Sequence, residues 1–378
     1  MGRRARGFLV VVLLAACGTL LAACGRSGDG VAASEDRTGA ESRPTIALLL
    51  PETKTARYET QDRPLFDQNI RRLCPECELL YSNANQEVAT QSSQVDAALA
   101  KGADVLVLDP VDSRAAAAMV RKARASGAAV ISYDRLILDI PVDHYVSFDN
   151  VKVGELQART LIARLRELGR PSGTVVLIHG SPTDNNAGQY KRGARQALER
   201  SALVLGAEYD TPDWSPDKAQ RQMEQAVTKL GVDTIAGVYA ANDGTAGGAI
   251  AAMKAAGFTR LPPVTGQDAE LEAVQRILAG EQYMTVYKAI AREAAVAATL
   301  AVALARRQPP PVGLINSDVE NGAGRVPSVL LEPVAVTAGN LAATVIADGF
   351  WTPAQVCTER LADACRAAGI VVASRTGS

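Results

Sequence analysis

The apolar residues of the chain occur in two patterns, short runs and longer stretches. Short runs that are apolar throughout are typical of buried strands, whereas longer stretches with apolar residues at helical spacing are typical of amphipathic helices. The longer stretches 86–100 and 151–168 each place apolar residues on one face, among them Val95 and Leu161. The short runs predict strands at 45–50, 78–82, 104–108, 128–132, 174–178, 234–240 and 283–287.

This alternation predicts an α/β fold in which parallel sheets are covered by helices on both faces. The strand runs are continuously apolar because a strand buried on both faces has no solvent side. A chain of 378 residues with this many strands exceeds one sheet of ordinary size, so we expect two doubly wound, parallel-sheet lobes. The stretch 146–151 (VSFDNV) is the expected crossing between them.

The first residues have the pattern of an export signal. Arg3, Arg4 and Arg6 precede an apolar run over 8–24 that is too short and wrongly flanked for a stable membrane span. We therefore expect the chain to be exported and residues 1–23 to be removed. Removal of these residues takes away three arginines and no acid, which changes the net charge from −1 to −4.

The sequence LAAC occurs twice in this apolar run and ends at Cys17 and at Cys24. A run of small residues before a cysteine resembles the lipobox of bacterial lipoproteins, in which that cysteine carries the lipid. Cys24 fits better, because apolar residues continue after Cys17 whereas a polar, flexible tether follows Cys24 over 24–44. A plain secretory signal with incidental cysteines is the alternative.

Four cysteines remain after the signal, namely Cys74, Cys77, Cys357 and Cys365. In an exported protein such close pairs predict two local disulfides. A redox or zinc-binding CxxC motif is the alternative for the first pair. However, a redox motif usually opens a helix, and zinc needs a second ligand pair that two histidines do not supply. No metal site is therefore predicted.

Polar side chains cluster where the predicted strands end, which is where open α/β sheets bind ligands. These residues are Asp134, Arg135, Asp149, Asn150, Asp184, Asn185, Asn186, Asn242, Asp243, Gln267 and Asp268, with Lys54, Arg57 and Tyr58 near the first strand. Carboxylate, amide and guanidinium forks match the adjacent hydroxyls of a sugar. Since only 4% of residues are aromatic, Tyr58 and Trp214 stand out as rings that could stack on a sugar.

Each of these residues also has a structural interpretation. Asp149, Asn150, Asn185, Asp268 or Asn242 could cap a helix, and Asp134 could simply pair with Arg135. The recurrence of such residues at several strand ends favours ligand binding. The sequence has no phosphate-binding glycine loop and no basic stripe, so neither a cofactor nor nucleic acid is expected.

Longer motifs then indicate a family. The motifs YDRLI, SFDNVKVGELQA, GSPTDNNA, NDGTAGGAI, GQDAELEAVQRILAGEQYMTVYK, VPSVLLEP and DGF lie in this order between about residues 45 and 350. Their sequence and order resemble the periplasmic D-xylose-binding proteins of bacterial ABC importers. The resemblance implies the type I periplasmic binding protein fold, with three hinge strands between its lobes. It places lobe one at 45–147 and 287–329, lobe two at 148–286 and 330–356, and a tail at 357–378.

The resemblance also implies roles for single residues. The positions that match the family's sugar-binding pattern are Asp134, Arg135, Asn185, Trp214, Asn242, Asp268 and Lys288. Near the first strand the sequence departs from the pattern. The family has an acidic pair after the strand, whereas here the strand ends in LLLPETK, which includes Lys54, and Arg57 and Tyr58 stand where the family has Arg-Trp. The four cysteines are further additions to the family pattern.

Together these patterns predict an exported, non-enzymatic protein anchored to the outer face of the cytoplasmic membrane through a lipid on Cys24. Its expected ligand is a monosaccharide, D-xylose or a related aldose. Its expected partner is an ABC permease, and we expect a monomer. One alternative is a sugar sensor that signals to a membrane receptor. Another is an exported hydrolase that uses Ser181 and His179.

Overall fold

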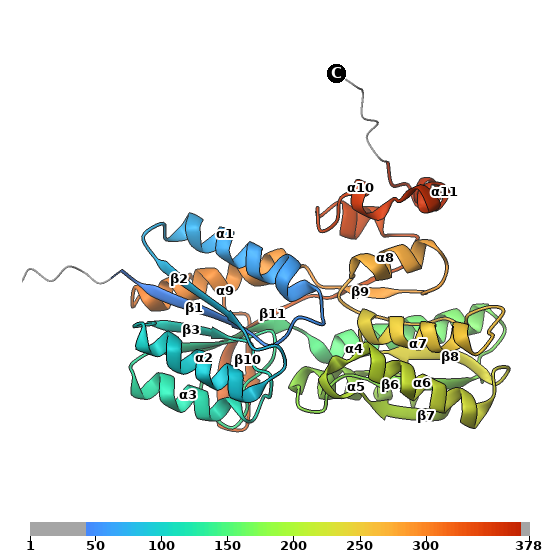
Figure 1. The fold of residues 1–378 in the computed structure, drawn as a ribbon, viewed down its shortest axis with the longest axis horizontal. Coiled ribbons are helices and arrows are strands. Elements are labelled where there is room, and N and C mark those ends of the chain that lie inside the picture. Colours follow the sequence, from blue (N-terminus) through green and yellow to red (C-terminus); the bar gives the residue numbers. More distant parts are fainter. Residues whose placement is uncertain (1–42, 372–378) are drawn as a thin grey trace, which may run out of the picture. The chain divides into compact units, whose positions relative to one another are not determined.

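The computed structural model describes residues 43–371, in which strands and helices alternate along most of the chain (Figure 1). The strands are β1 (Thr45–Leu50), β2 (Glu78–Asn83), β3 (Val105–Leu108), β4 (Ala129–Tyr133), β5 (His144–Phe148), β6 (Thr174–His179), β7 (Val204–Asp210), β8 (Ile235–Ala240), β9 (Thr285–Tyr287), β10 (Ser317–Glu320), β11 (Arg325–Leu331) and β12 (Val334–Val336). The predicted signal segment and Cys24 lie outside the described residues.

Helices lie between most of these strands along the chain. They are α1 (Arg63–Leu73), α2 (Val88–Ala100), α3 (Ala116–Ala125), α4 (Asn150–Glu167), α5 (Asn185–Leu198), α6 (Pro216–Leu230), α7 (Asp243–Ala255), α8 (Leu271–Leu278), α9 (Ile290–Ala305), α10 (Pro353–Val356) and α11 (Ala362–Ala367), with short helical turns at η1 (Tyr58–Asp62), η2 (Pro212–Trp214), η3 (Ala342–Ile346) and η4 (Glu359–Leu361).

Seven strands form one sheet, in the order β10-β11-β5-β4-β3-β1-β2. All neighbours in it are parallel except the edge pair β10–β11. This sheet is buried on both faces. Ala47 and Leu49 of β1 pack with α2 and α3, whereas the alternate residues Ile46 and Leu48 pack with α1 and α9. We call this sheet with α1, α2, α3 and α9 lobe one.

The strands β7-β6-β8 form a second, fully parallel sheet. Val175 and Leu177 of β6 pack with helices α4 and α5, and the alternate residues Val176 and Ile178 pack with α6 and α7. We call this sheet with helices α4 to α7 lobe two. The alternation of side chains explains why β6 is apolar at every position, as a strand between two helix layers requires.

The chain leaves or enters lobe one three times. The passages lie between β5 and α4, between β9 and α9, and between β11 and β12. Strands β9 and β12 pair with each other in an antiparallel two-stranded sheet. The exact residues at which the chain divides into lobes stay a prediction.

The predicted fold class is confirmed, and each predicted strand has a counterpart in the structure. The strand list omitted β5, β7, β10, β11 and β12. Edge strands such as β7 and β10 are partly exposed, so they do not form continuous apolar runs. The predicted helices 86–100 and 151–168 correspond to α2 and α4, but Leu168 follows the last turn of α4 and is exposed.

Both predicted cysteine pairs form disulfides. Cys74 and Cys77 close the turn after α1, and Cys357 and Cys365 join α10 to α11. Within residues 43–371, no helix has the length and apolar character needed to cross a membrane. The same range holds no cluster of three or more side chains that could bind a metal ion.

Helices α4 and α5 pack unusually closely because each presents a glycine to the other's backbone. A Cβ atom on Gly154 would lie 1.9 Å from the carbonyl oxygen of Tyr190, and one on Gly193 would lie 2.0 Å from that of Val151. We expect Gly154→Ala to lower the free energy of unfolding by about 1–3 kcal/mol, because the helices must move apart. Urea unfolding followed by circular dichroism measures this change.

Gly188 in α5 is the matched control, because a Cβ atom there would have no neighbour within 4 Å. Gly188→Ala should raise stability by about 0.5–1 kcal/mol, since alanine is the better helix former. Equal effects of the two substitutions would contradict the close approach of the helices.

Candidate ligand-binding site

A small cavity of about 20 Å³ lies where the strands of both lobes end. Its walls come from the loops and helix starts that follow β1, β4, β6, β7, β8 and β9, which is the expected position of a ligand site in parallel sheets. The lining residues are Thr55, Arg57, Tyr58, Asp134, Arg135, Asp184, Asn186, Tyr190, Trp214, Asn242, Gln267, Asp268 and Lys288.

Asp134 contacts four of the other residues that line this cavity. It follows β4 with a left-handed backbone angle φ of 52°. One carboxylate oxygen lies 3.3 Å from Arg57 and 3.7 Å from Nζ of Lys288, and the other accepts a 3.0 Å hydrogen bond from the Tyr58 hydroxyl. Its backbone carbonyl accepts from Asn186 of lobe two at 2.9 Å.

These contacts keep the Asp134 carboxylate charged. Burial by itself would raise the pKa of Asp134, but the nearby cations Arg57 and Lys288 outweigh burial and lower this pKa well below its ordinary value. The site therefore contains a buried anion that is stabilised by cations on either side.

Arg57 is itself held by a second layer of buried acids. It donates two hydrogen bonds to Asp62, at 2.8 and 2.6 Å, and one to Glu293 of α9 at 2.7 Å. The Tyr133 hydroxyl donates to the same Asp62 carboxylate at 2.6 Å. Burial would lower the pKa of Arg57, but Asp134, Asp62 and Glu293 raise it, so the guanidinium stays charged and fixed in orientation.

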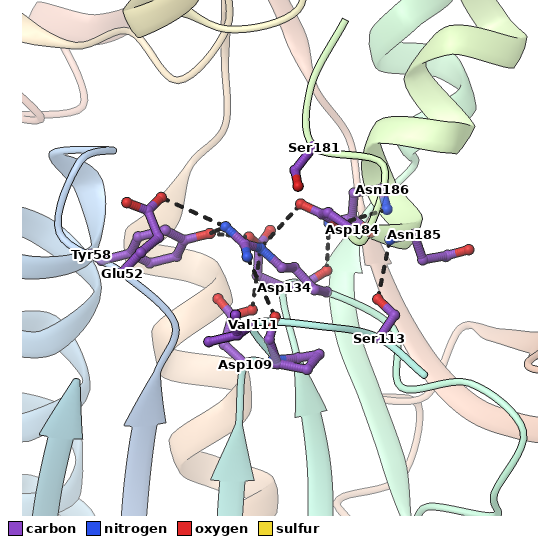
Figure 2. A network of polar contacts seen from close by, with 12 residues as sticks. Glu52, Tyr58, Asp109, Val111, Ser113, Asp134, Ser181, Asp184, Asn185 and Asn186 are labelled. Carbon is purple, nitrogen blue, oxygen red and sulfur yellow. Dashed lines mark hydrogen bonds and ion pairs between the residues drawn. The ribbon is translucent and has the colours of Figure 1, made fainter. Parts of the chain in front are cut away.

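Arg135 lies among three acidic groups, Glu52, Asp109 and Asp184, which are labelled in Figure 2. Its Nε lies 3.1 Å from Asp184 of lobe two, and its guanidinium lies 3.6 Å from both Glu52 and Asp109. It also donates to the Tyr58 hydroxyl at 3.2 Å. Burial raises the pKa of Asp109 well above its ordinary value, and Arg135 offsets this only in part.

Trp214 is fixed in the wall by its indole nitrogen and by its ring. Its Nε1 donates to Asp184 at 3.0 Å, and its ring lies so close to Gly180 that a Cβ atom there would be 1.9 Å from a ring carbon. Tyr190 meets the same ring edge-on, at 6.3 Å between centroids. A flat apolar face beside fixed polar groups is the arrangement that suits a sugar ring.

On the lobe two side, Asn242 and Asp268 supply further polar groups. Asn242 caps α7, with its side-chain oxygen accepting from the Thr245 amide at 2.9 Å, and it also lines the cavity. Asp268 pairs with Nζ of Lys288 at 3.0 Å and accepts from Gln267 at 3.2 Å. Both interpretations of Asn242, helix cap and cavity residue, therefore hold together.

Asp243 lies behind these groups and joins three elements. Its carboxylate accepts hydrogen bonds from the Glu270 amide at 3.0 Å, from Thr285 of β9 at 2.9 Å and from Gln282 at 2.7 Å. Gly266 leaves room for this carboxylate, since a Cβ atom there would lie 1.9 Å from it. Burial raises the pKa of Asp243 to about 7.

The lobes also meet at the rim of the cavity. The Ser113 amide donates to the carbonyl of Thr183 at 3.1 Å, and the Asn185 amide donates to the Ser113 hydroxyl at 3.1 Å. Further along the rim, Gln86 donates to the carbonyl of Asp213 at 3.3 Å. With these contacts and the Arg135–Asp184 pair, the lobes are closed over the site.

Eight of the ten predicted ligand-binding residues line this cavity, namely Arg57, Tyr58, Asp134, Arg135, Trp214, Asn242, Asp268 and Lys288. Lys54 is exposed, and Asn185 points away from the cluster in Figure 2. Its neighbour Asn186 faces Asp134 instead, so the amide of the DNNA motif that reaches the cavity is the second one.

Within the described residues, the structure lacks the bond between His179 and Ser181 that the predicted hydrolase alternative would require. Nε2 of His179 bonds Glu208 at 2.8 Å, whereas the Ser181 hydroxyl bonds Thr183 at 3.0 Å. The histidine and the serine therefore have different partners. The helix-cap interpretation holds for Asp149, which accepts from the Lys152 amide at 3.0 Å.

Sequence reasoning missed the buried acids Glu52, Asp62, Asp109 and Glu293. Asp109 ends β3 in the pattern VLVLD, so the strand-end rule could have found it. Glu293 is the one acid in the apolar helix α9, which is an unusual position for an unpaired charge. Asp62 carries no such signal.

Comparison with known proteins shows the family to which this chain belongs. A family model described as a periplasmic binding protein domain matches residues 46–309. The chain belongs to this family, as its sequence motifs predicted. Its members are solute receptors, so the prediction that the chain is not an enzyme is also confirmed.

Two relatives and one solved structure are similar to this chain over most of its length. The D-xylose-binding periplasmic protein of Escherichia coli (strain K12) is 38% identical over 310 residues, which cover 81% of this chain and 90% of the relative. A multiple sugar-binding periplasmic receptor of Rhizobium radiobacter is 31% identical, with 84% and 93% covered. A solved ABC transporter solute-binding protein from Clostridium phytofermentans with bound β-D-glucose superposes with a TM-score of 0.77 at 28% identity, covering 82% of this chain and 99% of that one.

The raised pKa of Asp243 predicts how stability depends on pH. An aspartate ordinarily titrates near pH 4, so between about pH 4 and about pH 7 the folded chain holds a proton that the unfolded chain has lost. The contribution of this group to stability is therefore present below about pH 4 and is lost as pH rises through about 7. In the wild type, the free energy of unfolding should therefore fall between about pH 5 and about pH 8. In the variant Asp243→Asn, this fall should be smaller by at least about 1 kcal/mol.

Urea unfolding at the two pH values measures this difference. Thr285→Val is the control, because it removes one hydrogen bond to Asp243 but keeps the titrating carboxyl group. The control should retain the fall that the wild type shows. An Asp243→Asn variant with the same fall as the wild type would contradict the assignment.

Proposed function

We propose that this protein captures a monosaccharide between its two lobes and delivers it to an ABC importer, and that the sugar is D-xylose. The observation that carries this proposal is the cavity itself. It gathers side-chain carboxylates, amides and guanidinium groups from both lobes around a space that also touches three aromatic rings. Such groups donate to and accept from neighbouring hydroxyls of a neutral ligand.

Two of these three rings come from opposite lobes. Tyr58 follows β1 of lobe one, and Trp214 follows β7 of lobe two, and both line the cavity. A pyranose has apolar C–H faces that pack on aromatic rings and a rim of hydroxyls that reaches polar groups. Tyrosine at position 58 keeps a ring at this place in the wall, and its hydroxyl also bonds Asp134.

Capture by closure follows from the way in which the two lobes share the site. Arg57 and Asp134 belong to lobe one, whereas Trp214 and Asn242 belong to lobe two. A ligand that bonds both sides binds the closed form more tightly than the open form, so it shifts the population towards closure. The closed lobes would then be the form that the permease receives.

The choice of D-xylose has support from the relatives. Two D-xylose-binding periplasmic proteins are 38% and 37% identical to the chain. Other similar proteins are named as multiple sugar-binding proteins, or hold D-glucose in their solved structures. The specificity of the site therefore needs a direct measurement.

We further propose that the protein is held at the outer face of the cytoplasmic membrane by a lipid on Cys24. The support is the LAAC motif with the polar tether after it. The protein then works as a monomer close to its permease.

Isothermal titration calorimetry of the purified protein against D-xylose, D-glucose, D-ribose, L-arabinose and myo-inositol tests the proposed ligand. D-xylose is expected to bind at least about tenfold more tightly than any other compound of the panel, which corresponds to about 1.4 kcal/mol. Tighter binding of another aldose would correct the sugar, and failure of every sugar to bind would refute the proposal.

The variant Arg135→Ala locates the binding event in this cavity. It should weaken D-xylose binding by about 2 kcal/mol or more, because it removes a charged donor and leaves buried acids without their cation. The matched control is Arg114→Ala, which breaks an exposed ion pair with Asp139 in lobe one and should leave affinity unchanged. Equal affinities of Arg135→Ala and wild type would remove Arg135 from the site.

Cell fractionation tests the anchor. Cys24→Ser should move the exported protein from the membrane fraction to the soluble fraction, because the lipid supplies the membrane affinity. Cys17→Ser is the control and should leave it membrane-bound. The opposite result would place the lipid on Cys17, and no change with either variant would exclude a lipid anchor at these cysteines.

A further inference from the structure

The last described part of the chain packs directly behind the site. We call residues 341–370 the C-terminal segment. It lies beside α8 and β9 in Figure 1, and the disulfide Cys357–Cys365 joins its two short helices. Its buried apolar residues share one cluster with Ala269, next to the cavity residue Asp268, and with Tyr287, next to Lys288.

Trp351 makes the contact nearest to the cavity. Its indole Nε1 donates a 2.7 Å hydrogen bond to the backbone carbonyl of Ala269. Both partners are buried, Ala269 completely. A buried carbonyl that loses such a donor has no water to replace it, so its peptide group must reorient or stay unpaired.

The loop that receives this bond is strained. Asp268 has φ of 92° and Ala269 has φ of 50°, although neither is glycine. Residues persist in such conformations only when their surroundings hold them there. The Asp268 amide donates to Val286 at 2.9 Å and the Ala269 amide donates to Thr285 at 3.2 Å, while Trp351 holds the carbonyl side of Ala269.

The same segment also supports the other half of the Asp268–Lys288 ion pair. Tyr287, one residue before Lys288, donates from its hydroxyl to Asp348 at 3.0 Å. Its ring meets that of Phe350 edge-on at 5.2 Å between centroids. Both members of this cavity-lining pair are thus one residue away from a contact with the C-terminal segment.

We propose that Trp351 is a positioning residue for ligand binding, and that the disulfide-stapled C-terminal segment holds Asp268 and Lys288 in their binding geometry. Trp351 does not touch the cavity and acts through Ala269 on Asp268. The inference rests on the proposed function only for its ligand, since the contacts are independent of which sugar binds.

The first test is the variant Trp351→Phe, which keeps an aromatic ring but removes the donor. D-xylose and D-glucose are the titrants, with calorimetry as the readout. For the tighter of the two sugars, affinity should fall about tenfold, because one buried hydrogen bond that orders the loop is lost. The chain has two tryptophans, so this variant also leaves Trp214 in the cavity as the single tryptophan whose fluorescence can report on binding.

A double-mutant cycle separates positioning from general weakening. If Trp351 acts through Asp268, its effect should shrink to less than about threefold in the background Asp268→Asn, because coupled residues do not add. Ile162→Val is the stability control. It shortens a buried side chain of α4 in a different apolar cluster and should leave affinity unchanged. Effects of Trp351→Phe and Asp268→Asn that multiply would overturn the proposal.

The disulfide provides a second variant if Trp351→Phe folds poorly. The double substitution Cys357→Ser with Cys365→Ser should weaken sugar binding, whereas Cys74→Ser with Cys77→Ser in lobe one should not. Hydrogen exchange reports on the loop without any sugar. Peptides that contain Asp268 and Val286 should exchange faster in the Cys357/Cys365 variant, whereas peptides from β6 should not change.

These outcomes also separate the inference from the proposed function. If wild-type protein binds neither sugar, the proposed ligand is wrong, and hydrogen exchange still tests the positioning role. If wild-type protein binds a sugar and the Trp351 and Cys357/Cys365 variants bind it equally well, the positioning role is wrong and the proposed function stands.

Discussion

The site depends on one constraint, which is that a charge buried between two lobes must have partners on every side. Asp134 is buried and charged, and it lies between Arg57 and Lys288. Removing a carboxylate from water costs several kcal/mol, so its position holds only because these cations stay close. The cations in turn need acids, which explains Asp62 and Glu293 behind Arg57 and Asp268 beside Lys288.

The contacts of this network are of two kinds, those within lobe one and those that join the two lobes. The contacts of Arg57 with Asp62, Glu293 and Asp134 lie within lobe one, so they persist whatever lobe two does. The pair of Arg135 with Asp184 joins the two lobes, as does the bond from Asn186 to Asp134. Lobe one therefore presents an ordered set of donors and acceptors, and the contacts with lobe two add the others. Such preorganisation lowers the ordering cost that binding would otherwise carry.

Much of the fold could be predicted from the sequence, because strands that are buried on both faces are apolar at every position. β1 and β6 are such strands, whereas the polar edge strand β10 has no such signal. Most of the cavity could also be predicted, since the ends of parallel strands meet at one edge. The orientation of Asn185, by contrast, could not be predicted. Two neighbouring amides begin α5, and only the helix geometry decides that Asn186 faces Asp134. The roles of Asp62 and Glu293 could not be predicted, because they depend on contacts between residues that are far apart in the sequence.

The backbone of the site, like its charges, is held in place by the residues around it. Three residues of the cavity wall, Asp134, Trp214 and Asp268, have φ of 52°, 52° and 92°, where glycine would be the relaxed choice. Each such residue costs about 1–3 kcal/mol, so the surrounding structure must hold it. Glycine would remove that cost, but it would also remove the carboxylate or the indole that lines the cavity. The anchors are specific in each case. Asp134 is held by the Val146 carbonyl, the Trp214 indole by Asp184, and the loop of Asp268 by β9 and Trp351. The groups that line the cavity are therefore placed only as precisely as the buried residues behind them allow.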